Sequence, residues 1–328
     1  MDLISTCAEV PRRGTGNLVA IGKWDGVHLA HQSVITALVA AAREMGGQSV
    51  VMGFHPLPMV ILRPDAAPPI LQTLEERAET LSALGVDVHL ALPFDRALAD
   101  MTPEAFVRAV LVGQLQARRV MVGFNFTFGR GGRGTAETLK HLCAEHGVPV
   151  EVFHPVRIGG ENVSSTEVRF SVASGEVERA TALLGRPFSV VGMVVGGDKR
   201  GRTIGYPTAN LNLAERRQLP AGGVYVAQVT ILGGQGACFG PLPCQVVPRT
   251  GPVYGGMLNL GRRPTFNGTG LRCEVHLFDY SGDLYGRELR VEFLQRLRGE
   301  QAFAGIEALK AQLARDEADA RSYLAADG

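Results

Sequence analysis

The sequence predicts a two-domain α/β protein in which an open, mostly parallel sheet covered by helices is followed by an antiparallel β domain with one closing helix. Three observations support this fold class. The 328 residues are enough for about two domains. Short apolar strands alternate with helical segments over the first half, as in parallel α/β sheets. After Gly185 only short strands separated by turn residues follow, which is typical of a barrel or a sandwich.

Strands and helices alternate over the first half of the chain. The apolar segments predicted as strands are residues 18–22, 49–54, 88–92, 120–123 and 150–153. Helices are expected between them, where apolar residues recur every three or four positions. The first of these helices is expected to end at Gly46 and Gly47. The next is expected to begin at the capping-box pair Thr73 and Glu76. Two more are expected to begin at Thr102, which Pro103 follows, and at Thr135.

The pattern changes near residues 185–188, where we place the boundary between domains 1–186 and 187–328. The strands predicted after it are residues 189–195, 224–231, 256–260, 274–278 and 289–294. One helix closes the chain, with Ile306, Leu309 and Leu313 expected on its apolar face. Residues 233–252 are rich in glycine and proline and are predicted as a long hairpin loop with no assigned chemistry.

Composition narrows the class of protein. Lysine and arginine number 33 against 32 acidic residues, so neither a nucleic acid nor a membrane surface is expected as a partner. Residues 1–16 show no apolar core of the signal-peptide type, and a reducing cytoplasm is the expected location. Five cysteines with no CxxC pair predict neither a disulfide framework nor a structural zinc site. We expect a monomer or a weak homo-oligomer.

The first chemical motif follows the first predicted strand and runs from Gly22 through Asp25 to His28 and His31. Open α/β sheets bind ligands beyond the carboxyl ends of their strands, and a helix N-terminus favours phosphate. Two imidazoles there can donate hydrogen bonds to phosphate oxygens. Alternatively, both histidines are surface or capping residues; a metal site is disfavoured, since no third ligand stands nearby at a familiar spacing.

Two further segments carry phosphate-binding residue types. Asn125 and Arg130 lie in a glycine- and arginine-containing segment after the strand at 120–123, which is either a flexible turn or a cradle for phosphate or base. The second segment contains Ser164, Thr166 and Arg169, which would lie within about two turns of a helix. A hydroxyl at 164 or 165 predicts a helix N-cap, which still leaves other amides for a phosphate.

The second chemical motif is the stretch from residue 196 to residue 210. Its anchors are Gly197, Lys199, Gly201, Arg202, Thr208 and Asn210. Such a loop can cover a triphosphate, and the neutral oxygens of Thr208 and Asn210 suit a hard cation such as Mg²⁺. Its two halves also fit a hairpin turn and a strand entry. Downstream, Glu274 shares a strand face with His276, although a carboxylate on a barrel strand is usually just solvated.

Together these segments resemble the bacterial bifunctional riboflavin kinase/FAD synthetases. Residues 22–31 stand where that family has a GxFDGxHxGH signature, residues 122–129 where it has VGxxFxFG, and residues 164–169 where it has SSTxxR. Residues 197–210 match the flavokinase signature GDxxGRTIGxPTAN nearly completely. The similarity extends over roughly residues 17 to 323, apart from residues 233–252.

The resemblance implies a Rossmann-like nucleotidyltransferase domain and a six-stranded antiparallel flavokinase barrel with a C-terminal helix. It implies riboflavin, FMN, FAD and ATP as ligands, with Mg²⁺ or another divalent cation. His28 and His31 would stabilise the α-phosphate of ATP, and Glu274 would deprotonate the riboflavin 5′-hydroxyl. The residues implied to hold the ligands are Gly22, Asp25, Asn125, Arg130, Ser164, Thr166, Arg169, Gly197, Lys199, Gly201, Arg202, Thr208 and Asn210. Of these, Thr208 and Asn210 would also bind the metal ion. Arg263 is expected either to contact phosphate or flavin or to shape a β-turn.

Departures from the family pattern leave alternatives open. Ala30 replaces the glycine between the histidines, Trp24 replaces a phenylalanine, and Leu57 replaces a histidine while His55 stands two residues earlier. One alternative is therefore a riboflavin kinase with a degenerate first domain. Another is a flavin-binding sensor or carrier without turnover. A cytidylyl or pantetheine-type transferase fits the first domain but leaves the barrel unexplained.

Overall fold

The computed structural model describes residues 1–197, 201, 204–233, 242–265 and 268–326, with the side chains of 262–265 and 268–271 left out of the description. The chain forms two compact units, each built from more than one segment. The first comprises Met1–Pro68, Gln72–Ser164 and Gln235–Pro248, and the second Pro69–Leu71, Ser165–Gly234 and Arg249–Gly328. Within these described ranges no helix combines the length and the apolar character needed to span a bilayer.

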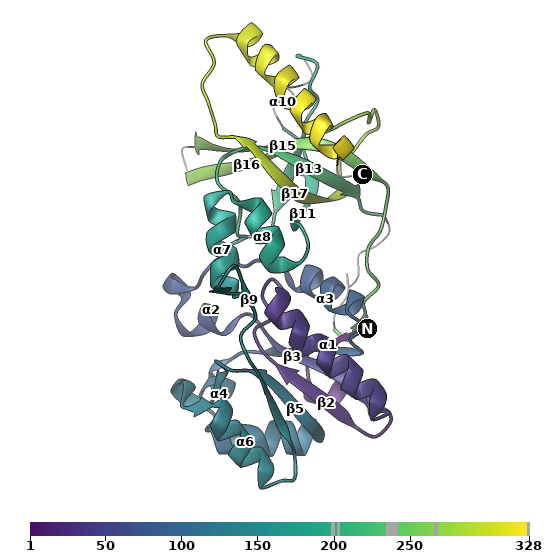
Figure 1. Ribbon diagram of the computed structural model, residues 1–328, viewed down its shortest axis with the longest axis vertical. Helices are drawn as coiled ribbons and strands as arrows, with labels where there is room; N and C mark the ends of the chain where they lie inside the picture. The colour runs from purple at the N-terminus through teal and green to yellow at the C-terminus, as the bar shows by residue number, and fades with distance from the viewer. Residues whose placement is uncertain (198–200, 202–203, 234–241, 266–267, 327–328) are drawn as a thin grey trace. The chain divides into compact units, whose positions relative to one another are not determined.

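The first unit is built on a seven-stranded sheet with the order β14-β1-β4-β3-β2-β5-β8, confirming the predicted parallel α/β domain (Figure 1). Its strands are β1 (Asp2–Ile4), β2 (Asn17–Ile21), β3 (Gln48–His55), β4 (Val88–Pro93), β5 (Ala117–Gly123), β8 (Val150–Phe153) and β14 (Cys244–Gln245). All pairings are parallel except that of β14 with β1. The chain moves outward from β2 through β3 to β4 and then returns to place β5 on the other side of β2. The boundary between β2 and β5 is therefore the topological switch point, where such sheets bind ligands.

Helices cover both faces of this sheet (Figure 1). On one side lie α1 (Leu29–Glu44) and α3 (Leu74–Ala83), and on the other α5 (Pro103–Phe106), η3 (Val107–Gln114) and α6 (Ala136–Ala144). Side chains alternate across β2: Leu18 and Ala20 pack on the α1 side, whereas Val19 and Ile21 pack on the α6 side. Burial on both faces explains why the strand is a continuous apolar run.

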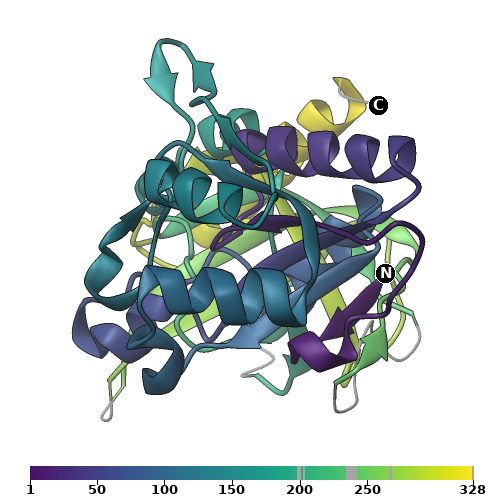
Figure 2. The same cartoon turned by 90° about the horizontal axis from the view of Figure 1, so that it is seen from below.

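Shorter elements complete the first unit. They are η1 (Cys7–Glu9), α2 (Pro58–Leu62), η2 (Pro64–Ala66), α4 (Arg96–Ala99), β6 (Thr127–Phe128), η4 (Arg130–Gly132), β7 (Gly134–Thr135), β9 (Arg157–Ile158) and β10 (Glu161–Asn162). The last two pair as a hairpin that projects from the rest of the unit (Figure 2).

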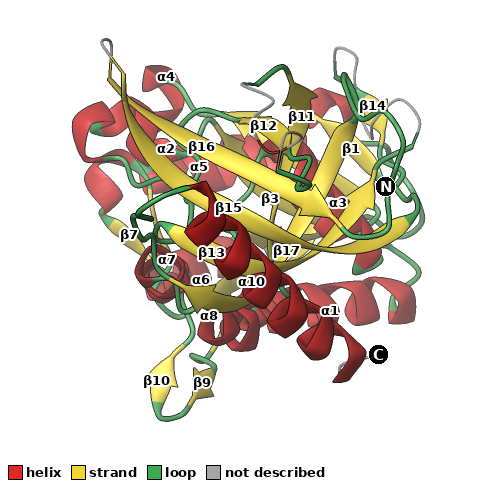
Figure 3. Ribbon diagram, turned by 90° about the horizontal axis from the view of Figure 1, so that it is seen from above, coloured by secondary structure: helices red, strands yellow, loops and turns green. Residues whose placement is uncertain are grey.

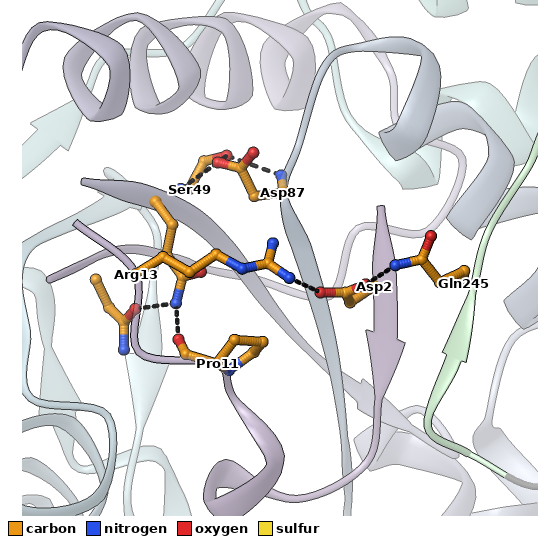
Figure 4. A network of polar contacts seen from close by, with 8 residues as sticks. Asp2, Pro11, Arg13, Ser49, Asp87 and Gln245 are labelled. Atoms are coloured by element: carbon orange, nitrogen blue, oxygen red, sulfur yellow. Dashed lines mark hydrogen bonds and ion pairs between the residues drawn. The ribbon is translucent and has the colours of Figure 1, made fainter. Parts of the chain in front are cut away.

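As predicted, residues 233–252 form a long hairpin loop, which connects the antiparallel neighbours β13 (Gly223–Ile231) and β15 (Val253–Thr265), but its described part also contributes a strand. Cys244 and Gln245 form β14, which pairs antiparallel with β1. A polar network holds this edge: the Asp2 carboxylate accepts hydrogen bonds from Arg13 and Gln245, both at 2.9 Å (Figure 4). Val246 packs beneath it in a small apolar cluster of its own. The segment therefore completes the first sheet, and it does so because its residues bring both edge hydrogen bonds and apolar cover.

No disulfide bond was expected from the cysteine spacing, but the structure contains one at Cys244. Cys244 is disulfide-bonded, whereas Cys7, Cys143 and Cys273 are free and buried. The sequence spacing, which contains no CxxC pair, gave no signal for this bond.

The second unit contains the predicted antiparallel domain as a closed six-stranded barrel of order β11-β12-β16-β15-β13-β17. Its strands are β11 (Phe188–Val195), β12 (Ala209–Leu213), β13 (Gly223–Ile231), β15 (Val253–Thr265), β16 (Gly268–Leu277) and β17 (Glu288–Arg298). Its helices are α7 (Ser165–Ser174), α8 (Val177–Leu184) and α10 (Ile306–Ala326). The predicted barrel with a C-terminal helix is confirmed.

Helix α10 lies across the barrel strands (Figure 3). Its Leu313 and Ala320 pack with Met257 and Phe278, and the buried Asp316 forms an ion pair with Arg298 of β17 at 2.7 Å. The prediction of Ile306 on the apolar face is wrong, because this side chain stands at the first residue of the helix and is 55% exposed.

Candidate active sites

The loop between β2 and α1 has an unusual backbone. Trp24, Gly26 and Val27 all have positive φ, at 52°, 86° and 40°. Positive φ is strained for a β-branched side chain such as valine. Trp24 and Val27 are nonetheless buried, and the Trp24 indole donates a hydrogen bond to the Met52 carbonyl at 2.8 Å. The loop is thus held in a conformation that it would not adopt alone.

This loop leads into α1, and the two predicted histidines lie at the start of that helix. His28 is the N-cap, and its Nδ1 accepts a hydrogen bond from the His31 backbone N–H at 3.4 Å. The two imidazole rings stack with centroids 3.7 Å apart. Because Nδ1 acts as an acceptor, the proton of a neutral His28 ring lies on Nε2. Ala30 lies within the first helical turn, where alanine is favourable, so this departure does not strain the helix.

Asn125 follows the neighbouring strand at the same edge of the sheet. Strands β2 and β5 are parallel partners, with Ala20 opposite Met121, so the loops after them leave side by side at the switch point. Asn125 is exposed in a turn closed by a hydrogen bond from the Phe126 N–H to the Gly123 carbonyl. The loops that carry Asn125 and the two histidines therefore leave the same edge of the sheet, as the parallel sheet predicts.

Other predicted residues of this motif have structural contacts. The Asp25 carboxylate is buried and accepts a hydrogen bond from the Gln72 N–H at 3.2 Å. Arg130 is exposed, and its Nε donates to the Asp100 carbonyl at 3.0 Å. Gly22 donates its N–H to the Met52 carbonyl, and an added Cβ there would overlap the Trp24 ring. Glycine is needed at position 22 for this close approach.

The serine–threonine segment opens α7. This helix begins at Ser165, directly after Ser164, which is the position that the N-cap interpretation predicts. Ser164 belongs to the first unit, whereas Thr166 and Arg169 belong to the second. Thr166 is exposed, and the Nε of Arg169 donates to the Pro69 carbonyl at 2.7 Å.

In the barrel, the two predicted groups of the second motif are cross-strand neighbours. Asn210 of β12 lies directly opposite Glu274 of β16, and Glu274 is in turn opposite Asn259 of β15. Their alternate neighbours, such as Val275, are buried in the barrel. Arg272 donates a hydrogen bond to the Glu274 carboxylate at 3.3 Å. The sequence analysis assigned a role to neither Asn259 nor Arg272. Asn259 is revealed only by the register across strands, whereas Arg272 lies two positions before Glu274 on the same strand, a spacing that the sequence already shows.

The described parts of the glycine-rich stretch lie against Asn210 and Thr208. A Cβ at Gly197 would overlap the Asn210 carboxamide, and a Cβ at Gly201 would overlap the Tyr206 carbonyl. The amides of Ile204 and Tyr206 both bond to the Gly201 carbonyl, so the chain folds back on itself just before Thr208. Lys199 and Arg202 lie outside the described residues. The backbone of Arg263 pairs with Gly270 in the β15–β16 ladder, and its side chain is outside the description.

One further residue supports this segment and was not assigned a role from the sequence. His276, two residues after Glu274 on β16, has its Nδ1 2.7 Å from the Pro207 carbonyl. Since a carbonyl only accepts, His276 must be the donor, which fixes its proton on Nδ1. Its ring also contacts Tyr206 edge to face. The strand that carries Glu274 thus holds the backbone just before Thr208.

Comparison with known proteins assigns the two units to known enzyme domains. Residues 11–167 match the model of the FAD synthetase family, and residues 184–324 match that of the riboflavin kinase family. The bifunctional riboflavin kinase/FMN adenylyltransferase of Escherichia coli (strain K12) is 38% identical over 321 residues, which are 98% of this chain and 96% of that protein. The chain belongs to the bifunctional riboflavin kinase/FMN adenylyltransferase family.

Other members of the family are similarly close over their whole length. The bifunctional riboflavin kinase/FMN adenylyltransferase of Pseudomonas fluorescens is 39% identical and covers 99% of this chain and 98% of its own. That of Bacillus subtilis (strain 168) is 34% identical over 94% of this chain and 92% of its own. The FAD synthetase domain and the riboflavin kinase domain are both present, and nothing in these comparisons favours a chain with the kinase activity alone.

Among solved structures, a crystal structure from Streptococcus pneumoniae has the same fold. It superposes with a TM-score of 0.83 at 33% identity and covers 97% of this chain and 98% of its own. That protein is described as a macrolide-efflux protein, a name that applies to it alone.

Proposed function

We propose that this chain phosphorylates riboflavin with ATP at Glu274 and adenylylates the resulting FMN with a second ATP at the His28–His31 loop. The observation that supports the kinase site is that Asn210 and Glu274 are cross-strand neighbours. We further propose that residues 1–186 carry the adenylylation and residues 187–328 the phosphorylation. The matches of residues 11–167 to the FAD synthetase model and of residues 184–324 to the riboflavin kinase model support this division.

In the kinase reaction, the riboflavin 5′-hydroxyl oxygen forms a bond to the γ-phosphorus of ATP. The bond from that phosphorus to the β,γ-bridging oxygen breaks, and ADP leaves. Glu274 accepts the hydroxyl proton, provided that the hydroxyl comes within hydrogen-bond reach of the carboxylate. The partner Arg272 keeps this carboxylate oriented through its hydrogen bond. We propose that the glycine-rich stretch covers the phosphates, with Lys199, Arg202 and Arg263 as the cationic contacts.

Residues of the barrel fit a magnesium ion carried by ATP. The Thr208 hydroxyl and the Asn210 carboxamide are hard, neutral oxygen donors, which suits an ion that keeps phosphate and water as its other ligands. Glycine at position 197 lets the backbone lie against the Asn210 carboxamide, because a Cβ there would overlap it. No group of three histidine, cysteine or acidic side chains in the described part of the chain could hold a metal instead. When bound, such an ion neutralises phosphate charge in the transfer.

In the adenylylation, an oxygen of the FMN phosphate forms a bond to the α-phosphorus of ATP. The bond to the α,β-bridging oxygen breaks, and diphosphate leaves. Because the attacking phosphate already carries charge, no general base is needed, and hydrogen-bond donors at the α-phosphate become the main requirement. The Nε2–H of His28, the His31 imidazole and the α1 N-terminus supply donors of this kind. Asn125, Ser164, Thr166, Arg169 and Arg130 are proposed to hold the nucleotide.

Product analysis tests both halves of the proposal. Purified protein is incubated with riboflavin, ATP and Mg²⁺, and FMN, FAD, ADP and diphosphate are followed over time. We expect FMN with ADP first, then FAD with diphosphate. A reaction that stops at FMN, also when FMN is supplied directly, would remove the adenylylation. No FMN from riboflavin would leave a flavin-binding protein without turnover.

A further inference from the structure

The search beyond the proposed sites led to a buried cation behind the histidine loop. Arg77 lies on α3, is only 2% exposed, and its Nη1 donates to the Lys23 carbonyl at 3.1 Å. The sequence analysis assigned it no role. A fully buried arginine is rare unless it is paired, so its contacts indicate what it does.

The charged surroundings of Arg77 keep the cation in place. Burial lowers its pKa, while the carboxylates of Asp25 and Glu75 act in the opposite direction. The imidazoles of His55 and His89 face the same cluster, and burial together with Arg77 lowers the pKa of each. Arg77 is therefore the permanent cation of this cluster, and Asp25 in the loop is the carboxylate that balances it.

Three consecutive loop residues each form a hydrogen bond with a residue elsewhere in the first unit. Lys23 is bound by Arg77, the Trp24 indole by the Met52 carbonyl, and Asp25 by the Gln72 amide. Directly after them come Gly26 and Val27, both at positive φ, and then His28. Helix α3 is itself anchored at its start by the reciprocal capping box of Thr73 and Glu76, next to Arg77. A fixed helix end thus reaches the loop that sets the histidines.

We propose that Arg77 is a positioning residue for FMN adenylylation: it holds the β2–α1 loop in its left-handed conformation and so fixes where His28 and His31 point. The inference rests on the proposed role of those histidines. Arg77 touches neither substrate nor reacting atoms in this account. It acts through the Lys23 carbonyl and the Asp25 charge, and small displacements of catalytic groups are known to have large effects on rate.

The chain offers a direct probe of this loop, because Trp24 is its single tryptophan. Its emission therefore reports the loop and nothing else. Riboflavin phosphorylation by the same chain reports whether the protein is folded and correctly quantified. Two substitutions separate charge from shape: Arg77→Met keeps length without charge, and Arg77→Lys keeps charge without the planar fork. Arg43→Met, at an exposed position of α1, is the matched control.

We expect R77M to lower kcat for FAD formation by about 100-fold with little change in KM for ATP, since the histidines act in the transition state. Trp24 emission should shift to longer wavelength with stronger acrylamide quenching, while FMN formation stays at the wild-type rate. R77K should recover most of the lost kcat, and R43M should match the wild type throughout. Should R77M fail to fold, R77K still carries the test through the same two readouts.

Two results would overturn the inference: R77M and R77K forming FAD at the wild-type rate, or losing FAD formation while Trp24 emission stays unchanged. If wild-type protein itself makes no FAD, the proposed adenylylation fails instead. The emission of Trp24 in R77M then still decides whether Arg77 holds the loop.

Discussion

Asn210 on β12 and Glu274 on β16 face each other directly across an antiparallel ladder. Residues so paired have β-carbons about 4.5–5.5 Å apart, within the span of one phosphoryl group and its attacking oxygen. A carboxamide suited to a phosphate-bound cation and a carboxylate suited to a hydroxyl proton thus share one row of the barrel.

Replacement of the carboxylate should abolish proton transfer without disturbing the barrel. We expect Glu274→Gln to lower kcat for riboflavin phosphorylation by about 10²–10⁴-fold, because glutamine retains the shape but accepts no proton. FMN adenylylation by the same protein should persist. Separate assays of FMN from riboflavin and FAD from FMN measure this, with the exposed Glu215→Gln as control. Retention of kinase activity in E274Q would rule out Glu274 as the base.

Removal of the Asn210 carboxamide should change the Mg²⁺ dependence of riboflavin phosphorylation. Asn210→Ala should raise the Mg²⁺ concentration needed for half-maximal kinase activity by about tenfold or more, as loss of metal-site groups commonly does. Asn212→Ala, an exposed position two residues along the same strand, should leave it unchanged. The measurement is a Mg²⁺ titration of FMN formation at fixed free ATP. Identical titration curves for N210A and N212A would contradict the assignment.

The stacked histidines His28 and His31 should be needed for FMN adenylylation. We expect His31→Ala to lower FMN adenylylation by about 10²–10³-fold, the usual effect of losing a donor to developing charge, and to leave the kinase rate unaffected. His28→Ala should have a larger effect, since it removes both a donor and the N-cap of α1. His141→Ala, at an exposed position of α6, is the control. Loss of both activities in a folded H31A protein would show that the two reactions do not use separate residues.

Acid should destabilise the first unit through His89. Burial, then Arg77 and His55, hold the pKa of this imidazole well below its ordinary value near 6.5. Below pH 6.5 the unfolded chain therefore binds a proton that the folded chain does not, so the free energy of unfolding falls with pH by up to about 1.4 kcal/mol per unit. Urea unfolding followed by Trp24 emission at several pH values measures this loss.

His89→Leu is the matching variant, because it fills the site with an apolar side chain that does not titrate. It should show a shallower loss of stability between pH 6.5 and 5, with the remainder due partly to His55, whose pKa is also lowered by burial. Equal slopes for H89L and the wild type would show that His89 does not carry the effect.

The free thiols should resist alkylation in the folded protein. Burial raises the pKa of Cys7 and Cys143 to about 11 and that of Cys273 to about 12. Their reactive thiolate forms are thus nearly absent near neutral pH. Mass spectrometry after iodoacetamide treatment should find these positions modified only when denaturant is present. Modification of Cys273 in the native enzyme would mean that β16 opens next to Glu274.

Much of this architecture could be predicted because local signals agreed with the fold. The capping box at Thr73 and the apolar runs of β2 and β3 each specify their element within a few residues. Strand β12 was predicted only as an alternative, a strand entry at the PTAN motif, since proline and asparagine favour turns over strands. Its strand character comes from pairing with β11 and β16, which the local sequence does not encode.

Site residues divide in the same way. Residues that carry a motif, such as His28 and Asn210, could be named because their motifs resemble those of a known family. Arg77 and Asn259 could not, because their roles arise from contacts across elements far apart in the chain: Arg77 reaches a loop more than fifty residues earlier, and Asn259 meets Glu274 through strand register.

Strand β14 has a consequence for how this protein is made. The edge of the first sheet stays open until residue 245 has left the ribosome, long after the strands at its centre have been synthesised. During that interval β1 presents unpaired backbone groups to any neighbouring chain. A fragment ending at residue 186 would keep that open edge permanently, so dividing the gene at a single point should yield an amino-terminal half that is prone to self-association.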